Sequence, residues 1–593
     1  MDKGISKEAA KILQRFEEAK RQRQTKDAKW RELDAFDRGE QWNLGDVKIP
    51  AWVPKPVTNY VHLVKTTKRA ALAIENPAAM ILGQSPEDHL KAKELQKVVD
   101  FVWEQIKARK VVRECLDTAK LLGTGIAKVY YDAENDTVKG GKGGKYTGEI
   151  KVRQIDPANF YPDPNAFTLE DCEYIHLVYR RPLKWVEERF NVKGLKPTER
   201  SHNEQGEIYQ RAYSSERKDK IVDFHEHYEK VPNPDDVGGY TYYVTYMAGD
   251  KIVRERQPLK PNCYPFAILY DFPQRQDFWG QSTCEIILDN QKLINKVESI
   301  MALIGSLLQN PQKIVHKQSG ISPEEVAKYG SAPGHVWLSN TPPDQAMRWS
   351  DPPQIPQALF NLAEQARLNI REITGLTEAY MGQTVGSLQT STGGNSLIER
   401  STMRDRDQMY GLELFVEQLT HIIIQFIIEY YSETRIARIL GDNNEPEFFE
   451  FKGTDYRDVA YDIKVDVSAK APVTKVRKQE ELDKLLNIQG QYQFSPAIIT
   501  PQEYVEESDF IDSEKFVERM NMEEIRSAEA IMTETLQMMT EAQQQGLPQE
   551  EIAQMAQAML LQKFEQKQKG IGSATSENTG DMQLRQGQAT GVV

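Results

Sequence analysis

The sequence predicts an α+β protein that is mainly helical. Apolar residues recur every three or four positions up to residue 123 and again from residue 280 onward, which indicates amphipathic helices. Between these regions, apolar and polar residues alternate, which indicates strands. With 593 residues, of which 39% are hydrophobic, the chain can bury ample core. Its length alone suggests about four domains.

The first helical region contains four expected helices. The first of them is charged and carries one apolar face that includes Phe16, Trp30 and Phe36. A proline-rich crossing separates it from the second helix, and a Gly-Thr-Gly sequence ends the fourth. The expected helices span residues 5–38, 59–74, 86–106 and 110–123.

The alternating region predicts antiparallel strands. The expected strands span residues 126–131, 149–155, 174–180, 220–228, 240–247 and 251–255. A short helix is expected at 182–190, and a charged segment without clear pattern at 193–219 is expected to be a loop.

From residue 280 the chain returns to helices, which enclose a small proline-rich segment. Apolar residues recur every three or four positions over about seven turns, until Asn310-Pro311 stops the helix. Short strands and turns are expected at 313–355, and a second helix at 357–373. Two helices around a small insertion outline a stalk with a tip.

A loop from Gly382 to Ser396 contains no ionisable side chain, although a helix precedes it and a long helix is expected from about residue 397 to 431. Long loops inside compact domains are usually functional or disordered. The loop is therefore either a plain linker or a polar surface that contacts a partner without strong attraction. Its hydroxyls and amides could hydrogen-bond phosphates without adding a counterion-release term.

Beyond residue 431, strands are expected at 447–451 and 461–467. Residues 475–566 read as helices rich in Gln, Glu and Met, which suit adaptable packing surfaces. Residues from about 570 onward are rich in Gly, Ser, Thr and Gln and are expected to be disordered.

The composition excludes several classes of protein. A net charge of −13 argues against a simple non-specific DNA binder, although a protein that lets nucleic acid pass remains compatible with it. The four cysteines form no CxxC pair, so reduced and mostly buried thiols are expected. The N-terminus lacks an apolar signal region, and the longest apolar runs are far below the ~20 residues of a membrane span. We expect a cytosol-like compartment and no membrane.

No motif identifies an enzyme or a cofactor site. The glycine-rich sequence around residues 140–147 fails the phosphate-loop pattern and joins two strands rather than leading into a helix. Asp223, His225, His227 and Glu229 share one face of an expected strand, but at ~3.3 Å per residue no more than two of them can reach one ion. A polar outer strand face is the favoured interpretation. A metal-dependent hydrolase that uses Asp223, His225 and His227 stays open as an alternative.

Four stretches of the sequence, taken in order, resemble the portal proteins of tailed bacteriophages. The resemblance extends to about residue 470. It rests on the Trp and Gly-x-Gln-Trp residues of 30–42 with Pro-Val-Thr-Asn at 56–59, on Ile-Asp-Pro-Ala-Asn-Phe-Tyr-Pro-Asp-Pro at 155–164, on 264–295 with its Phe-Trp-Gly-Gln-Ser sequence, and on Ile-Thr-Gly at 373–375 before the neutral loop.

The resemblance implies a portal-type subunit with an α/β wing, a two-helix stem, a small α/β clip and a helical crown. The implied parts are a wing at 1–280, stem helices at 281–310 and 356–375, a clip at 311–355, a tunnel loop at 376–396, a long wing helix with returning strands at 397–470, a crown at 471–566 and a disordered tail at 567–593. The tunnel loop is assigned by its position, because no residue motif marks it.

The resemblance also implies a function. Portal proteins form a ring, usually of twelve subunits, at one capsid vertex, and double-stranded DNA passes through its axis. The implied partners are the terminase large subunit, the head-completion or tail adaptor protein, and the major capsid and scaffolding proteins. The protein would assemble in the host cytoplasm, reside in the virion, need no cofactor and catalyse no reaction.

Three groups of residues would carry that function. The DNA-channel loop would use Gln383, Thr384, Ser387, Gln389, Thr390, Ser391, Thr392 and Asn395. The clip would dock the terminase and the adaptor through Lys317, Glu324, Glu325, Lys328 and Trp337. The stem would pack subunits together through Leu293, Val297, Ile300, Ile304, Leu359 and Leu362. A ring would cover the apolar stripes that an isolated stem exposes. The alternative within virion proteins is an assembly or scaffold-like component without a DNA channel.

Overall fold

The computed structural model describes residues 6–42, 49–73, 79–133, 148–198, 220–233, 238–309, 311–330, 332–350, 356–376, 405–432, 434–440, 446–457 and 459–465. The chain divides into two compact units, Met1–Ser468 and Ala469–Val593, and all the described residues belong to the first. Residues 377–396 of the expected tunnel loop, the expected crown and tail, and the glycine-rich sequence at 140–147 lie outside the described residues.

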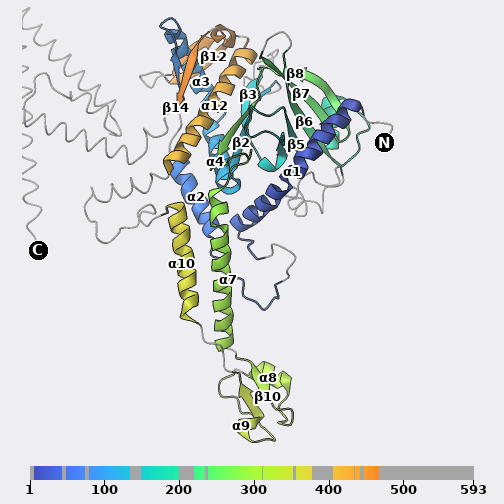
Figure 1. Cartoon of the computed structure of the whole chain (residues 1–593), viewed down its shortest axis with the longest axis vertical. Helices are drawn as coiled ribbons and strands as arrows, with labels where there is room; N and C mark the ends of the chain where they lie inside the picture. Colours follow the sequence, from blue (N-terminus) through green and yellow to red (C-terminus); the bar gives the residue numbers. More distant parts are fainter. Residues whose placement is uncertain are drawn as a thin grey trace, which may run out of the picture. The chain divides into compact units, whose positions relative to one another are not determined.

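A five-stranded antiparallel sheet with strand order β4-β5-β6-β7-β8 forms one part of the body, and helix α1 lies across it (Figure 1). The elements are α1 (Lys7–Asp37), β4 (Phe160–Pro162), β5 (Tyr174–Pro182), α5 (Leu183–Phe190), β6 (Ile221–Pro232), β7 (Tyr240–Ala248) and β8 (Lys251–Pro258). Phe16 of α1 packs on Tyr161 and Val178 of the sheet. The buried Arg23 guanidinium donates to the carbonyls of Pro157, Ala158 and Phe160, which fixes the helix to the turn before β4.

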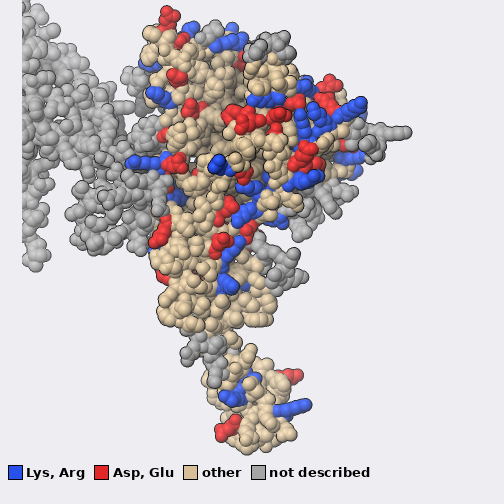
Figure 2. Space-filling model, in the orientation of Figure 1, with Lys and Arg blue, Asp and Glu red and all other residues tan. Residues whose placement is uncertain are grey.

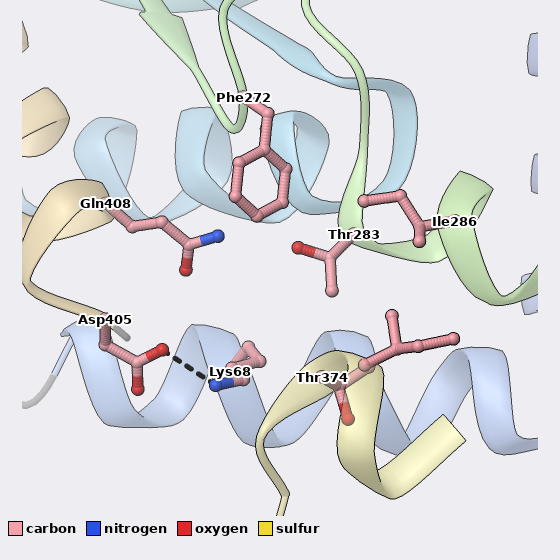
Figure 3. A pocket seen from close by; sticks show the side chains of 8 residues that line it. Lys68, Phe272, Thr283, Ile286, Thr374, Asp405 and Gln408 are labelled. Carbon is pink, nitrogen blue, oxygen red and sulfur yellow. Dashed lines mark hydrogen bonds and ion pairs between the residues drawn. The ribbon is translucent and has the colours of Figure 1, made fainter. Parts of the chain in front are cut away.

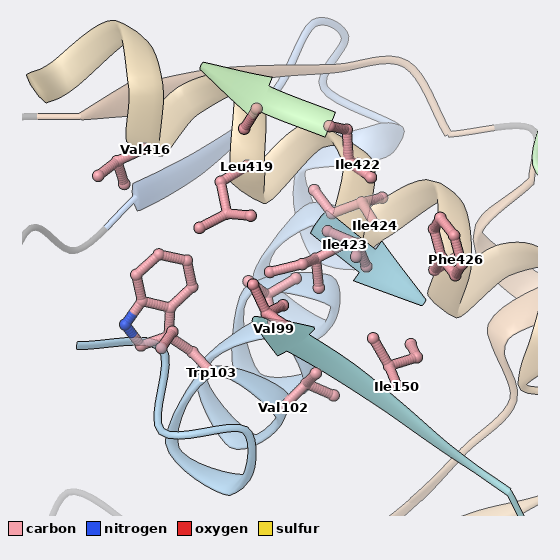
Figure 4. Close-up of a cluster of buried hydrophobic side chains, with 14 of the residues drawn as sticks. Val99, Val102, Trp103, Ile150, Val416, Leu419, Ile422, Ile423, Ile424 and Phe426 are labelled. Carbon is pink, nitrogen blue, oxygen red and sulfur yellow. The ribbon is translucent and has the colours of Figure 1, made fainter. Parts of the chain in front are cut away.

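A three-stranded antiparallel sheet with strand order β3-β2-β9 carries the largest apolar core. Helices α3, α4 and α12 contribute to this core, and Figure 4 shows Val99 and Trp103 of α3 close to Leu419 and Ile423 of α12. The elements are α3 (Asp88–Gln105), α4 (Ala108–Leu122), β2 (Thr124–Asp132), β3 (Glu149–Ile155), β9 (Phe266–Tyr270) and α12 (Arg406–Tyr430).

Among the described helices, α12 alone is long and apolar enough to cross a membrane by length and composition. However, 61% of its most apolar window is buried inside the protein. Its buried residues pack in the core of Figure 4, so α12 has the burial of a core helix.

Two small ribbons complete the body. Strand β1 pairs with β14 although the two lie almost 400 residues apart in the chain, and β12 pairs with β13. The short helical turns η1 and η3 precede β4 and β14. These elements are β1 (Ala79–Gly83), η1 (Pro157–Asn159), β12 (Arg435–Leu440), β13 (Pro446–Phe451), η3 (Gly453–Tyr456) and β14 (Tyr461–Val465).

Two helices, α7 (Thr283–Gln309) and α10 (Gln357–Thr374), extend from the body side by side (Figure 1). We call them the helix pair. Helix α2 (Tyr60–Ala73) contributes to the apolar cluster at their base. Between α7 and α10 the chain forms a small module of residues 311–350, which contains β10 (Lys313–Val315), α8 (Pro323–Tyr329), α9 (Pro343–Ala346) and β11 (Met347–Trp349).

The structure confirms the predicted elements wherever it describes them, with ends that shift by a few residues. Strands β1, β4, β9 and β12 were not predicted, and helices α8 and α9 lie where only short strands and turns were expected. Residues 199–219 of the expected loop and residues 397–404 of the expected long helix lie outside the described residues, and α12 begins at Arg406. Cys115, Cys172 and Cys284 are buried free thiols as predicted, and Cys263 is half-buried.

The predicted polar outer face of β6 is wrong. Asp223, His225 and His227 are 8%, 4% and 3% exposed, because α1 covers this face of the sheet. The ring of Phe16 on α1 lies edge-on to His225, with 5.0 Å between ring centroids. Strand periodicity correctly placed these residues on one face, but it cannot reveal which face a distant helix covers.

Candidate functional site

The helix pair is held together by small residues and one ion pair. Ala363, Ala366 and Ile370 of α10 are buried, and Ala366 and Ile370 join Ile287 and Leu288 of α7 in one apolar cluster. Arg367 donates to Glu298 of α7 at 2.8 Å. Because residue 370 packs near 287 and residue 367 near 298, the two helices run antiparallel.

The residues that belong to the predicted subunit-packing stem separate into two classes. Val297 and Ile304 are 2% and 8% exposed within the single chain, so their apolar contacts are already made there. Leu293, Ile300 and Leu359 are half-buried, and Leu362 is exposed. The structure therefore leaves the outer part of the predicted set, and not Val297 or Ile304, available to a neighbouring molecule.

Helix α10 exposes four large apolar side chains that sequence analysis left out or did not separate. Phe360, Leu362, Leu368 and Ile373 are between 40% and 45% exposed. In Figure 2 charged residues are visible on the upper part of the helix pair, whereas its lower part, toward the small module, is almost entirely uncharged. Exposed apolar surface of this kind marks an interaction site on a soluble protein.

These four residues occupy two flanks of α10. At about 100° per residue, Leu362 and Ile373 are three turns apart on one side of the helix. Phe360 and Leu368 lie on the other side, about 160° to 240° away from that flank. The buried stripe of Ala363, Ala366 and Ile370 runs between the two flanks. A helix with two separate apolar flanks can contact two neighbours at once.

A cavity of about 320 Å³ lies where the helix pair meets the body. Figure 3 shows side chains from α2, α7, α10 and α12 around it, together with Phe272 from the segment after β9. Its lining is Lys68, Phe272, Thr283, Ile286, Ile373, Thr374, Asp405 and Gln408.

The cavity contains the buried ion pair of Lys68 and Asp405, whose Nζ and Oδ1 atoms are 2.7 Å apart. Burial lowers the pKa of Lys68, and the negative charge of Asp405 opposes this shift by favouring the ammonium. The pair links α2 to the residue immediately before α12.

A second buried network lies beside this pair. Lys120 of α4 donates to Asp271 at 2.7 Å and to Gln408 of α12 at 2.6 Å. Asp271 also accepts from the backbone N–H and the hydroxyl of Thr283, the first residue of α7, and so satisfies a free N–H of that helix. The start of α7, the start of α12 and helix α4 are thereby joined by polar contacts shielded from water.

The segment that contains the predicted channel loop leaves and re-enters the described fold at this cavity. Helix α10 ends at Thr374, Gly375 adopts a left-handed conformation, and Leu376 is buried. The chain returns at Asp405, and both Thr374 and Asp405 line the cavity. The predicted loop residues themselves, Gln383 to Asn395, lie outside the described residues. The described residues on either side of this segment, Thr374 and Asp405, both line the same cavity.

The small module presents most of the predicted docking residues to solvent. Lys317, Glu324, Glu325 and Lys328 are exposed, and the Ser322 hydroxyl caps α8 by accepting from the N–H of Glu325. Trp337 differs from its neighbours, because it is half-buried and packs against the cluster of Ile321, Val326 and Ala346. Val336 and Leu338, on either side of it, are 78% and 86% exposed, and sequence analysis did not select them.

Two of the four sequence stretches that resemble portal proteins, 30–59 and 264–295, meet at the base of the helix pair. Gln291 of α7 accepts from the N–H of Tyr60 and donates to Asn295, and Asn295 donates to Gln41. Asn59 donates to the carbonyls of Phe36 and Asp37. These polar residues therefore join the end of α1, the start of α2 and helix α7.

The strip of Asp223, His225 and His227 does not form an accessible reaction centre, because α1 seals it. Across the described part of the chain, no group of three or more His, Cys, Asp or Glu side chains could hold a metal ion. The hydrolase alternative therefore loses the residues on which it depended.

The fold defines a structural subunit in which a helix pair with exposed apolar side chains extends from the body and carries a small module at its end. A family model described as phage P22-like portal protein matches residues 13–570. The chain belongs to the phage P22-like portal protein family. It is a structural component of the virion that forms a ring at a capsid vertex, in contact with capsid and DNA, and the genome is packaged and ejected through it.

Proposed function

We propose that the helix pair is the stem of a ring that contains about twelve copies of the chain, and that each α10 contacts both neighbours. The observation that carries this proposal is the pair of apolar flanks, Leu362 with Ile373 and Phe360 with Leu368. A ring needs two different patches on each subunit that are complementary to each other, and two flanks of one helix meet this need. Leu293, Ile300 and Leu359 would extend these contacts.

In this proposal, the segment that contains Gln383 to Asn395 lines the path of double-stranded DNA. Both of its ends are anchored beside the Lys68–Asp405 pair, so the segment begins and ends at one position in every subunit. A ring would repeat that position around its axis. Since residues 382–396 carry no charge, they can contact phosphates without the salt-dependent attraction that would hold DNA in place.

The small module would be the clip. Its exposed charges at Lys317, Glu324, Glu325 and Lys328 suit reversible docking of the terminase large subunit and, later, of the tail adaptor. Val336 and Leu338 would supply the apolar part of that contact, while Trp337 would support the surface from beneath. Assembly in the host cytoplasm with scaffolding and major capsid proteins completes the proposed sequence of events.

Deleting residues Val385–Gly394 tests the proposed role of the loop. We expect rings to form as in the wild type, whereas DNA packaging or retention should fall. The matched control replaces the same residues with a Gly/Ser sequence of equal length, which should restore part of the packaging because it remains uncharged. Loss of ring assembly on deletion would instead make the segment structural and would contradict the proposal.

A further inference from the structure

A group of arginines alternates with aromatic rings on the body, away from the helix pair. It consists of Arg153, Tyr179, Arg181, Trp185, Arg189 and Arg254, which we call the arginine–aromatic patch. The Arg181 guanidinium lies 5.5 Å from the ring centroid of Tyr179 and 5.2 Å from that of Trp185. The Arg189 guanidinium lies 5.8 Å from the same Trp185 ring. Arg153 lies 4.7 Å from Tyr179. The patch is thus a continuous series of cations and rings.

Packing contacts hold the aromatic side chains of the patch in place. Trp185, on α5, packs edge-on against Phe190 and Phe224, and Val186 next to it is fully buried. Arg254 of β8 lies 5.9 Å from the ring of Phe190, so a neighbouring strand adds a cation beside the helix. A surface whose side chains are already held in place loses little conformational freedom when a partner binds.

The patch itself contains four arginines and no carboxylate. The buried carboxylate of Glu226 forms an ion pair with Lys128. Arg153 also stabilises the charge of Glu226, so several cations share this one carboxylate. Within the residues that the structure describes, Arg181 and Arg254 form no ion pair of their own. Four arginines grouped with aromatic rings stand out in a chain whose net charge is −13.

We propose that the arginine–aromatic patch binds an acidic segment of a partner protein that also carries apolar side chains. Arginine offers paired donors to carboxylates, and Trp, Tyr and Arg are the residues that dominate binding energy at protein interfaces. Trp185 is 39% exposed, so its ring offers apolar surface beside the charges of Arg181 and Arg189. Duplex DNA presents phosphates outward and no free ring or aliphatic group to cover Trp185, whereas an acidic peptide supplies both kinds of contact.

The test uses the purified full-length protein and a short fluorescein-labelled peptide in which Glu alternates with Tyr and Leu. We expect saturable binding by fluorescence anisotropy. The triple variant Arg181→Gln, Arg189→Gln, Arg254→Gln should weaken it, by about tenfold for each arginine that makes a charge-assisted hydrogen bond. Trp185→Ala should weaken it by about tenfold, and Trp185→Phe should recover part of that loss.

Matched controls separate the patch from general electrostatics. The triple variant Lys91→Gln, Lys93→Gln, Lys464→Gln makes the same change in charge on exposed side chains elsewhere and should bind like the wild type. A peptide with Gln in place of Glu should not bind. Thermal unfolding of each variant checks that the fold is intact.

Three outcomes would overturn the proposal: no binding by the wild type, equal loss in the control lysine variant, or binding that the arginine variant leaves unchanged. A short DNA duplex in place of the peptide tests the other class of polyanion. If the duplex bound more tightly than the peptide and depended on the same arginines, the patch would be a nucleic-acid site instead.

Discussion

Lys68 and Asp405 form a buried ion pair across 337 residues of sequence, with 2.7 Å between Nζ and Oδ1. Their side chains are 3% and 2% exposed. A buried pair costs much desolvation energy, so it is weak evidence for stability, yet removal of only one partner leaves an uncompensated charge. The pair fixes the position where the chain enters α12 after the segment that carries the neutral loop.

The Lys68→Met variant should be destabilised by about 3–5 kcal/mol, because the buried carboxylate of Asp405 would lose the ammonium that offsets its charge. The double variant Lys68→Met, Asp405→Leu should recover most of that loss. Chemical denaturation of the three proteins measures both effects. If the single and double variants lost the same free energy of unfolding, the two side chains would stabilise the protein through packing at the cavity and not through their charges.

Gly280→Ala should destabilise the junction between β2 and α7. A Cβ atom at Gly280 would lie 2.4 Å from the carbonyl oxygen of Gly123, a backbone atom that cannot move away cheaply. We expect a loss of about 2 kcal/mol, as for an overpacked core. Gly305→Ala is the control, because a Cβ there meets nothing within 4 Å and should stabilise α7 by about 0.5–1 kcal/mol. If Gly280→Ala left the free energy of unfolding unchanged, the backbones of Gly280 and Gly123 could not be as close as the structure has them.

Acid should weaken the contact of α1 with the sheet. Burial lowers the pKa of His227 to about 3 and that of His176 well below its ordinary value of 6.5, and nearby Arg15 and the other histidines act in the same direction. The folded state therefore stays neutral where the unfolded state takes up protons. This contribution to stability is complete above about pH 6.5 and is lost as the pH falls toward about 3.

Each such histidine should make unfolding easier by about 1.4 kcal/mol per pH unit within that range. His227→Phe should lower this slope, whereas His89→Gln, at an exposed position, should leave it unchanged. Denaturant titrations at several pH values between 6 and 4 measure the slope. An unchanged slope in His227→Phe would show that His227 is not held neutral.

The two flanks of α10 predict how variants should assemble. Leu362→Glu, Ile373→Glu removes one flank and Phe360→Glu, Leu368→Glu removes the other, so each protein alone should be monomeric. A mixture of the two retains one intact interface and should form pairs that grow no further. Light scattering after size exclusion measures the masses.

Gln365→Glu changes charge at an exposed polar position of α10 and serves as the control, which should still form rings. Self-association of either flank variant alone would mean that the contacts are symmetric or lie elsewhere, and would remove the flanks from the interface.

Much of the architecture follows from local pattern. The helices α1 and α7 and strands β5, β6, β7 and β8 of the large sheet were predicted because their apolar residues repeat with the period of their own element. The neutral loop and the two helices around the small module were also visible in the sequence. Such features can be predicted because they depend only on residues that are close together in the sequence.

What could not be predicted depends on distant segments. Strand β1 contains five residues and finds its partner at β14, so nothing near it in sequence marks it as a strand. The burial of His225 under Phe16, the burial of Val297 and Ile304 within their own chain, and the pairing of Lys68 with Asp405 arise from tertiary packing. The apolar flanks of α10 could be recognised only after Ala363 and Ala366 were seen to face α7.

Negative-stain electron microscopy of the purified full-length chain tests the central claim most directly. We expect closed rings of about twelve subunits, with an axial opening wide enough for duplex DNA. A protein that stays monomeric under assembly conditions, or that forms open-ended polymers instead of closed rings, would contradict it.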